Sequence, residues 1–300
     1  MSRSAVLSDS QWALIQPVLP SSTGRAGRPF RDDRHVVEGI IYRYRCGLPW
    51  RDVPAEFGPW QTLWKRHRRY SGEGVWDEVL SVLLTDADAR GLVDWSVSID
   101  STINRAHQHA ANLPRDTGAP SNYTNLREEP ADHAIGRSRG GLSTKIHALV
   151  DGHGRPLVLL TSPGQAGDSP MFPYLMDQLR IARSGAGRPR TRPERVRADK
   201  AYSSRAIRAH LRERGIEAVI PQPSDQIGHR IRRGSRGGRP PGFDRDDYKN
   251  RNVVERNFAT FKQWRGLATR YDKLAITYRG GAVLRAITIW SKALIGAHSH

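Results

Sequence analysis

Near its C-terminal end the chain reads Tyr248-Lys-Asn-Arg251-Asn-Val-Val-Glu255-Arg-Asn-Phe-Ala-Thr-Phe-Lys262, and no other stretch is more informative about its architecture. Residues three and four apart share one face of a helix. In a helix, one face of this stretch carries a phenol, a guanidinium, a carboxylate and an ammonium: Tyr248, Arg251, Glu255 and Lys262. A second face carries apolar side chains that can anchor the helix in a core: Val254, Phe258 and Phe261. This pattern suits a metal-dependent site for phosphates, although a surface helix with an i,i+4 ion pair also has it.

The composition points to a polyanionic partner. The 300 residues include 48 Lys and Arg against 30 Asp and Glu, a formal net charge of +18. Nucleic acid is the first candidate partner for such a chain, and an anionic membrane surface the second. No apolar run approaches the roughly 18 to 20 residues of a membrane span, and the N-terminal residues resemble no signal peptide, so we expect a cytoplasmic, nucleoid-associated protein without a membrane partner. The single Cys46 excludes an internal disulfide and a cysteine-based zinc site.

The first 90 residues are predicted to be helical. Ser8 is expected to cap a helix from Asp9 to about Val18. A second helix, 32–45, has a predicted buried stripe: Val36, Val37, Ile40, Ile41 and Tyr44. A short helix over 50–57 precedes helices 60–70 and 76–84, which together resemble a helix-turn-helix. Helix 60–70 is expected to turn Trp60, Leu63 and Trp64 to the core and four cations outward, with no acid among them: Lys65, Arg66, Arg68 and Arg69. Such a helix can lie in a major groove or along phosphates, although an isolated basic helix is more often simply solvated.

From residue 93 onward, strands alternate with helices. The predicted strands are 95–100, 143–150, 156–161, 195–199 and 218–220, and the predicted helices are 168–181, 203–214 and 282–293. Glycines between the second and third strands predict an antiparallel hairpin. Residues 222–247 lack periodicity, are rich in Gly, Pro and Arg, and are interpreted as a mobile basic loop. The fold class is therefore α/β with a mixed sheet, not a purely parallel one.

Three acids are candidates for chemistry. Asp100 and Asp199 each end a predicted strand, where side chains leave the sheet, and Glu255 lies on the informative helix. Two Asp and one Glu meeting at such an edge would give hard oxygen ligands for Mg²⁺. Two ions roughly 3.5 to 4 Å apart can activate the attacking oxygen and stabilise the leaving oxygen of a phosphodiester displacement. Taken singly, each Asp is more often a helix cap or a turn residue.

Several motifs together resemble one protein family. The spacing Tyr-x₂-Arg-x₃-Glu-x₆-Lys at 248–262, the segment Ser98-Ile-Asp100-Ser-Thr and the segment Ala198-Asp199-Lys-Ala-Tyr match the transposases of bacterial insertion sequences, specifically the DDE group of the insertion-sequence-5 type. Three further segments look like those of that family: residues 47–54, 105–109 and 136–147. The resemblance extends over nearly the whole chain.

The resemblance implies an RNase H-like catalytic domain, residues 91–300, after a helix-turn-helix-like DNA-binding domain, residues 1–90. It implies that Asp100, Asp199 and Glu255 bind two Mg²⁺ ions, for which Mn²⁺ can substitute. Enzymes of this kind bind terminal inverted repeats, hydrolyse a phosphodiester at each transposon end, and use the freed 3′-hydroxyl to attack target DNA. We expect double-stranded DNA as partner, a homodimer in the DNA complex, no small-molecule cofactor and no covalent protein–DNA intermediate.

Other residues are candidates for contact with DNA. By the same resemblance, Tyr248, Arg251 and Lys262 hold DNA near the scissile phosphate, which suits the two-donor geometry of Arg and the point charge of Lys. Arg105, His107 and Lys145 are further candidates, and Lys145 could instead offset the acids. Two rival functions stay open: an RNase H-like nuclease such as a resolvase, and a catalytically silent DNA-binding repressor. The repressor would not need the three carboxylates to meet in space.

Overall fold

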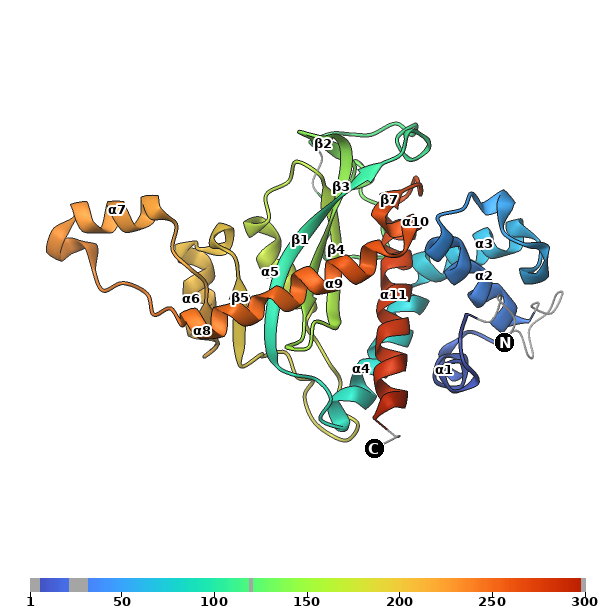
Figure 1. The fold of residues 1–300 in the computed structure, drawn as a ribbon, viewed down its shortest axis with the longest axis horizontal. Coiled ribbons are helices and arrows are strands. Elements are labelled where there is room, and N and C mark those ends of the chain that lie inside the picture. Colours follow the sequence, from blue (N-terminus) through green and yellow to red (C-terminus); the bar gives the residue numbers. More distant parts are fainter. Residues whose placement is uncertain (1–5, 22–31, 119–120, 298–300) are drawn as a thin grey trace.

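The N-terminal region is helical, as the sequence predicts. The computed structural model describes residues 6–21, 32–118 and 121–297 (Figure 1). Its first helices are α1 (Asp9–Ile15), α2 (Asp33–Cys46), α3 (Trp60–Glu73) and α4 (Val75–Ala89). The predicted stripe of α2 is buried throughout. The short helix predicted over 50–57 is two separate 3₁₀ turns, Trp50–Asp52 and Ala55–Phe57, because Pro54 lies between them.

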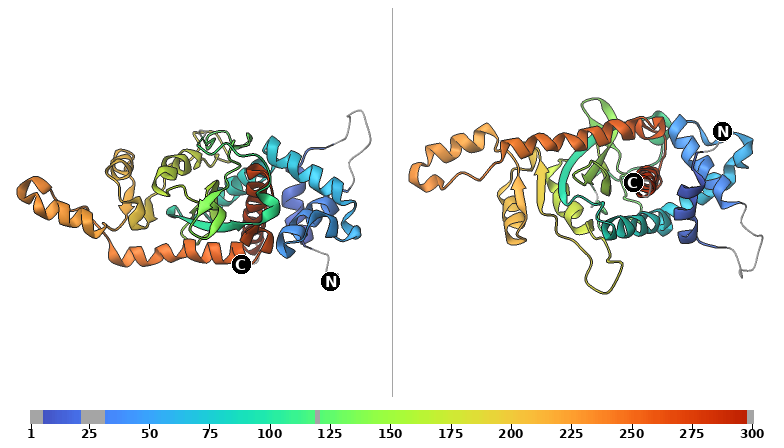
Figure 2. Two further views of the ribbon diagram at one scale, coloured as in Figure 1. Left: turned by 90° about the horizontal axis from the view of Figure 1, so that it is seen from above. Right: turned by 60° about the horizontal axis from the view of Figure 1, so that its bottom comes forward.

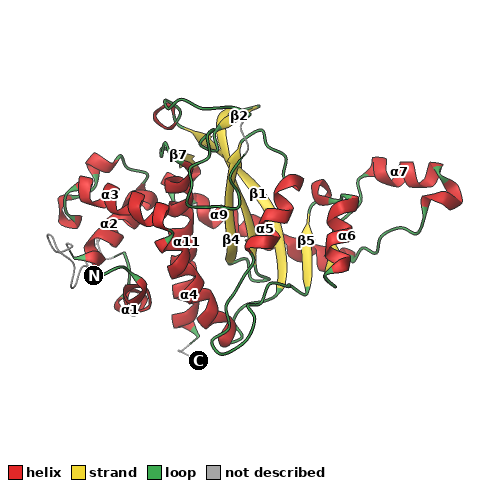
Figure 3. Cartoon of the chain, turned by 180° about the vertical axis from the view of Figure 1, so that it is seen from behind, coloured by secondary structure: helices red, strands yellow, loops and turns green. Residues whose placement is uncertain are grey.

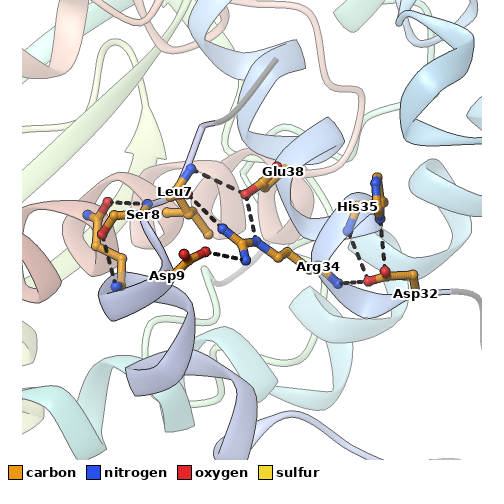
Figure 4. Close-up of polar contacts among 8 residues, drawn as sticks. Leu7, Ser8, Asp9, Asp32, Arg34, His35 and Glu38 are labelled. Carbon is orange, nitrogen blue, oxygen red and sulfur yellow. Dashed lines mark hydrogen bonds and ion pairs between the residues drawn. The ribbon is translucent and has the colours of Figure 1, made fainter. Parts of the chain in front are cut away.

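Caps and one arginine fix the start of the chain against α2. The Ser8 hydroxyl accepts from the Gln11 amide, and the Gln11 side chain accepts from the Ser8 amide, each at 3.1 Å, which forms a capping box. Arg34 of α2 reaches Asp9 at 2.7 Å and donates to the Leu7 carbonyl at 3.1 Å (Figure 4). The predicted cap at Ser8 is confirmed, and α1 is held beside α2 by charged hydrogen bonds.

The sheet is built around β1 (Ser96–Ala106). On one side β1 pairs antiparallel with β3 (Gly141–Val150), which pairs antiparallel with β4 (Pro156–Pro163) and at its start with β2 (Gly136–Ser138). On the other side β1 pairs parallel with β5 (Arg195–Ala198) and, at its far end, with β7 (Thr269–Arg270). The strand at the edge of the sheet beyond β5 is β6 (Glu217–Val219), which is parallel to β5. The predicted hairpin is confirmed, and the mixed order β4-β3-β1-β5-β6 is that of the RNase H-like fold.

Helices cover both faces of the sheet. On one face, α9 (Asn252–Lys262) contacts β1 and β3; on the other, α5 (Phe172–Gln178) contacts β3 and β4 (Figures 2 and 3). Helix α6 (Arg205–Glu213) lies near the β5–β6 edge. Helix α10 (Arg265–Ala268) leads through β7 to the long C-terminal α11 (Ala275–Gly296). Within the described residues, no helix combines the length and the apolar character that crossing a bilayer requires.

The N-terminal helices share a core with the C-terminal helix. α11 packs against α1, α3, α4 and β4, and one buried apolar cluster runs from Trp12 and Leu63 through Val283 to Val97 of the sheet. Removal of the N-terminal helices would therefore expose one side of α11. The division at about residue 90 stays a prediction.

His67 of α3 links these helices and makes the fold sensitive to acid. Its Nδ1 accepts from the Trp76 indole N–H at 3.2 Å, and its Nε2 lies 3.0 Å from the Thr277 carbonyl. Burial lowers the pKa of His67 from 6.5 to about 4. The fold therefore favours the neutral ring, and this contribution is full above pH 6.5 and is lost as the pH falls toward 4. The loss is expected to reach about 3 kcal/mol of unfolding free energy. An NMR titration of the folded chain checks this, and a midpoint near 6.5 for His67 would contradict it.

The segment 222–247 differs from its prediction. It contains α7 (Ser224–Arg232) and the start of α8 (Arg245–Tyr248), where an irregular loop was expected throughout. No residue of α7 is buried, and the helix projects from the sheet at the end opposite the N-terminal helices (Figure 1). Asp225 in its first turn and the basic last turn suit the helix dipole. Local charge placement thus favours a helix that has no core-facing pattern.

Candidate active site

The two aspartates lie where β1 and β5 part. The parallel ladder between these strands ends at the pair Ile99 and Ala198, and the next residues are Asp100 and Asp199. Asp199 ends its strand, as predicted, and its carboxylate accepts from the Ala201 amide at 2.8 Å. The prediction that Asp100 ends its strand is wrong, because β1 continues to Ala106 along β3. Asp100 follows the last residue of β1 that pairs with β5, so the sheet opens between these two strands beside both aspartates.

The helix that carries Glu255 is anchored as predicted. Val254, Phe258 and Phe261 of α9 are all buried, and α9 packs on β1 and β3 of the sheet. The stretch 248–262 is not one uninterrupted α-helix, however. Tyr248 ends α8, a 3₁₀ turn covers Lys249–Arg251, and α9 begins at Asn252.

Arg251 joins two of the three predicted acids. Its Nη1 donates to Asp100 Oδ2 at 2.8 Å, and its Nη2 donates to Glu255 Oε1 at 2.6 Å. The guanidinium also lies 5.8 Å from the centre of the Tyr248 ring. Asp100 of β1 and Arg251, which are 151 positions apart in the sequence, are thereby brought into contact. Arg251 thus contacts both Asp100 and Glu255. Asp199 follows the last paired residue of β5, as Asp100 follows the last residue of β1 that pairs with β5.

Within the site, the Asp100 side chain is mostly shielded from solvent, whereas the Glu255 side chain is exposed. Burial raises the pKa of Asp100, against the opposing effects of the Ser101 amide and the Arg251 guanidinium, and the nearby Asp199 charge raises it further. The Glu255 side chain is 60% exposed. A partly buried carboxylate near another is stabilised by a cation, and the Arg251 guanidinium supplies that charge.

The donor set fits a hard divalent cation. Asp100 and Glu255 offer carboxylate oxygens to one positive charge, which Arg251 provides. Among the described residues, no three His, Cys, Asp or Glu side chains are placed to hold a metal ion as they stand. Carboxylate oxygens are the hard ligands that divalent cations such as Mg²⁺ prefer, and metal binding at Asp100 and Glu255 would require Arg251 to leave them.

Other predicted DNA contacts have varied surroundings. Lys262 lies on the exposed side of α9 and reaches the Ile103 carbonyl at 3.3 Å. Arg105 is exposed and donates to the Gly140 carbonyl. His107 stacks on Tyr271 with ring centres 4.9 Å apart. Lys145 is 9% exposed and pairs with Asp168, so the structure shows it offsetting an acid and not presented to DNA.

Helix α3 presents only part of the predicted basic face. Lys65 and Arg68 are exposed, and Arg69 is partly exposed. The prediction that Arg66 projects outward is wrong: it is 7% exposed and forms an ion pair with Asp33 of α2. Helical spacing places residue 66 beside Leu63 and Tyr70, on the side that packs. Trp60 and Trp64, predicted to face the core, are only partly buried.

One acid near the site was not singled out from the sequence for a functional role. Asp168 was expected only to cap a helix, yet its carboxylate accepts from the Ser101 hydroxyl at 2.7 Å and from Lys145 at 2.8 Å. The available signal was indirect. Lys145 lies in a strand that is buried from Ser143 onward, and a buried ammonium requires a partner.

Two family profiles match the chain. A profile described as "Transposase DDE domain" matches residues 93–281. A second, described as "Putative transposase of IS4/5 family", matches residues 7–80.

Individual relatives agree with these profiles. The putative transposase of insertion sequence element IS6501 from Brucella ovis is 31% identical over 149 residues, which are 50% of this chain and 98% of the relative. The putative transposase of IS402 from Burkholderia cepacia is 32% identical over 149 residues, 50% of this chain and 62% of the relative. The solved Mos1 pre-cleavage transpososome is 12% identical with a TM-score of 0.25, over 91% of this chain and 81% of that one, a likeness too weak to bear on function. Because the catalytic-domain profile covers more than half of the sequence, the chain belongs to the IS4/5-type family of DDE transposases.

Proposed function

We propose that the chain binds the terminal inverted repeats of an insertion sequence, cleaves their phosphodiesters by two-metal hydrolysis, and transfers the 3′-hydroxyl into target DNA. The observation that carries the proposal is the meeting of Asp100 and Glu255 at one cation, with Asp199 beside them where β1 and β5 part. Family membership supports the same chemistry.

Asp100, Asp199 and Glu255 are the residues that would hold Mg²⁺ or Mn²⁺. Bound there, such ions would supply activation of the attacking oxygen and stabilisation of the leaving oxygen. The part of Arg251 is to release its two carboxylates and donate two parallel hydrogen bonds to a phosphate. Tyr248 and Lys262 lie on either side of Glu255 along the helical segment, so they can contact the DNA backbone next to the scissile phosphate.

The N-terminal helices are proposed to bind the transposon ends as a DNA-binding domain. Lys65 and Arg68 of α3 are exposed and carry the same charge, which suits contact with phosphates. Arg105 and His107 extend the proposed DNA surface on the side of the sheet near β7. Cleavage at two ends calls for two active sites, so we propose a homodimer in the DNA complex.

Substitutions on α3 test this surface better than deletion of the N-terminal helices, which pack on α11. Lys65→Ala together with Arg68→Ala is expected to weaken end binding and reduce the salt slope by about two, one for each lost phosphate contact, without change in stability. Arg66→Ala is the control, because it removes one positive charge from the same helix at a buried position. It is expected to cost about 2 kcal/mol of unfolding free energy, since Asp33 loses its partner. Filter binding at several salt concentrations measures the DNA affinity and its salt slope, and urea unfolding measures the stability of each variant. Equal DNA binding by the double variant and the wild type would contradict the proposal.

A strand-transfer assay separates the proposal from its rivals. End DNA with a free 3′-hydroxyl is incubated with supercoiled target, protein and Mn²⁺. A transposase joins the end to the target, whereas a nuclease of the resolvase kind only nicks and a silent repressor only binds. Nicking without any joined product would reject strand transfer and favour the nuclease.

A further inference from the structure

Asp168 is an acid near the site for which the proposed function has no role. It follows β4, in the turn over residues 164–168 before α5. Its Oδ1 accepts from the Ser101 hydroxyl at 2.7 Å and from Lys145 Nζ at 2.8 Å. Lys145 Nζ also donates to the Ala166 carbonyl at 2.7 Å. One carboxylate oxygen therefore connects strand β1, strand β3 and this turn.

The turn is seated by its backbone, independently of the ion pair. The Gly164 amide donates to the Ser143 carbonyl at 3.1 Å, and a Cβ at Gly164 would lie 1.9 Å from the Ser143 hydroxyl. A Cβ at Gly136 of β2 would lie 1.6 Å from the Gln165 side chain. At Gly164 an added Cβ would also come within 3.0 Å of the Ser143 Cβ and carbonyl oxygen, so the close packing of the turn on β3 depends on this glycine, whereas the Gln165 side chain could turn away from a Cβ at Gly136. Loss of the Asp168 charge should therefore leave the turn in place.

Ser101 connects this turn to a proposed metal ligand. The Ser101 amide donates to Asp100 Oδ1 at 2.8 Å, while the other oxygen of Asp100 binds Arg251. Asp100 and Ser101 lie just beyond Ile99, where β1 loses its pairing with β5 and keeps only β3. Successive side chains of a strand point to opposite faces, so Asp168 acts on this peptide from the face opposite Arg251.

Tyr202 places Asp168 in the same electrostatic environment as both catalytic candidates. Its ring is fully buried, and its hydroxyl has no hydrogen-bond partner among the described residues. Burial raises the pKa of Tyr202 well above its ordinary value, and the charges of Asp168, Asp100 and Asp199 raise it further. All three carboxylates thus lie within electrostatic reach of one phenol.

We propose that Asp168 is a positioning residue: through Ser101 it fixes the orientation of the Asp100 carboxylate for metal binding and DNA cleavage. The inference rests on the proposed function. Lys145 keeps Asp168 in place from β3, and Asp168 itself touches neither the substrate nor the metal. A purely structural ion pair is the competing explanation, and it predicts an effect on stability alone.

Asp168→Asn tests the inference through metal binding as well as activity. Loss of a residue that orients a metal ligand is expected to weaken Mn²⁺ binding and slow nicking, each by roughly 10- to 100-fold, with an unchanged KM for DNA. Ser101→Ala should act in the same direction, and Ser101→Thr, which keeps the hydroxyl, should restore both. Since the two residues act through one link, the double variant should be no worse than the poorer single variant. Titration calorimetry with Mn²⁺ on the full chain and nicking of end DNA give these values.

The matched control is Asp77→Asn, which breaks a comparable pair with Arg279 between α4 and α11. In both pairs the cation is nearly buried: the side chain alone is 11% exposed in Lys145 and 9% exposed in Arg279. Asp77→Asn is expected to lower stability and leave Mn²⁺ binding unchanged. Wild-type Mn²⁺ binding by Asp168→Asn, or by Ser101→Ala should Asp168→Asn not fold, would overturn the inference. Glu255→Gln is measured in parallel: if it nicks like the wild type, the proposed function itself fails, and if only Asp168→Asn is unaffected, the positioning role alone fails.

Discussion

Glu255→Gln is expected to lower Mg²⁺-dependent nicking of the element's end DNA by about a thousandfold, since loss of one carboxylate ligand removes several kcal/mol of transition-state stabilisation. The amide keeps the shape of the side chain and can still accept from Arg251, so the fold is expected to survive. The measurement is the rate of nicking of supercoiled plasmid that carries the element's ends, in Mg²⁺ and in Mn²⁺.

Glu78→Gln is the control for this variant. Glu78 is exposed on α4, outside the proposed site, and its substitution removes the same charge. It is expected to nick like the wild type. Equal rates for Glu255→Gln and Glu78→Gln would remove Glu255 from the mechanism.

Arg251→Gln is expected to change metal binding and cleavage in opposite directions. In the free protein the guanidinium occupies both Asp100 and Glu255, so a divalent cation has to displace it. Without this competitor, Mn²⁺ is expected to bind about tenfold more tightly in the absence of DNA, equivalent to about 1.4 kcal/mol. Nicking should nevertheless fall by at least about tenfold, because a charge-assisted contact to the phosphate is lost.

Arg256→Gln is the matched control for Arg251. It removes the same charge from the same helical segment, at an exposed position of α9. It is expected to leave Mn²⁺ affinity near the wild-type value, whereas Arg251→Lys, which keeps the charge, should bind Mn²⁺ less tightly than Arg251→Gln. Weaker Mn²⁺ binding by Arg251→Gln would show that the arginine supports the metal site and does not compete with the metal.

Short-range patterns explain what the sequence predicted well. The buried stripe of α2 and the apolar face of α9 follow from helical spacing, and the β3–β4 hairpin follows from glycines between two apolar runs. Asp199 directly follows the strand Arg195–Ala198, so its place at a strand end is also a local property. Each of these features is decided by residues that lie close together in the sequence.

Partners distant in sequence explain most of what was missed. Asp100 lies inside β1 because β3, some 45 residues later, pairs along the polar half of the strand. Arg66 is buried against an acid 33 positions earlier, which its own helix does not reveal. Asp168 receives its hydrogen bonds from 67 and 23 positions away. Helix α7 has no buried face, so apolar periodicity does not indicate it.

We propose that Asp100, Asp199 and Glu255 together bind the metal ions that cleave DNA. Anomalous diffraction from crystals of the protein with its end DNA and Mn²⁺ tests this most directly. We expect manganese peaks within coordination distance of all three carboxylates and of the scissile phosphate, with Arg251 moved onto the DNA. Manganese bound elsewhere beside cleaved DNA, with Arg251 still on Asp100 and Glu255, would contradict it.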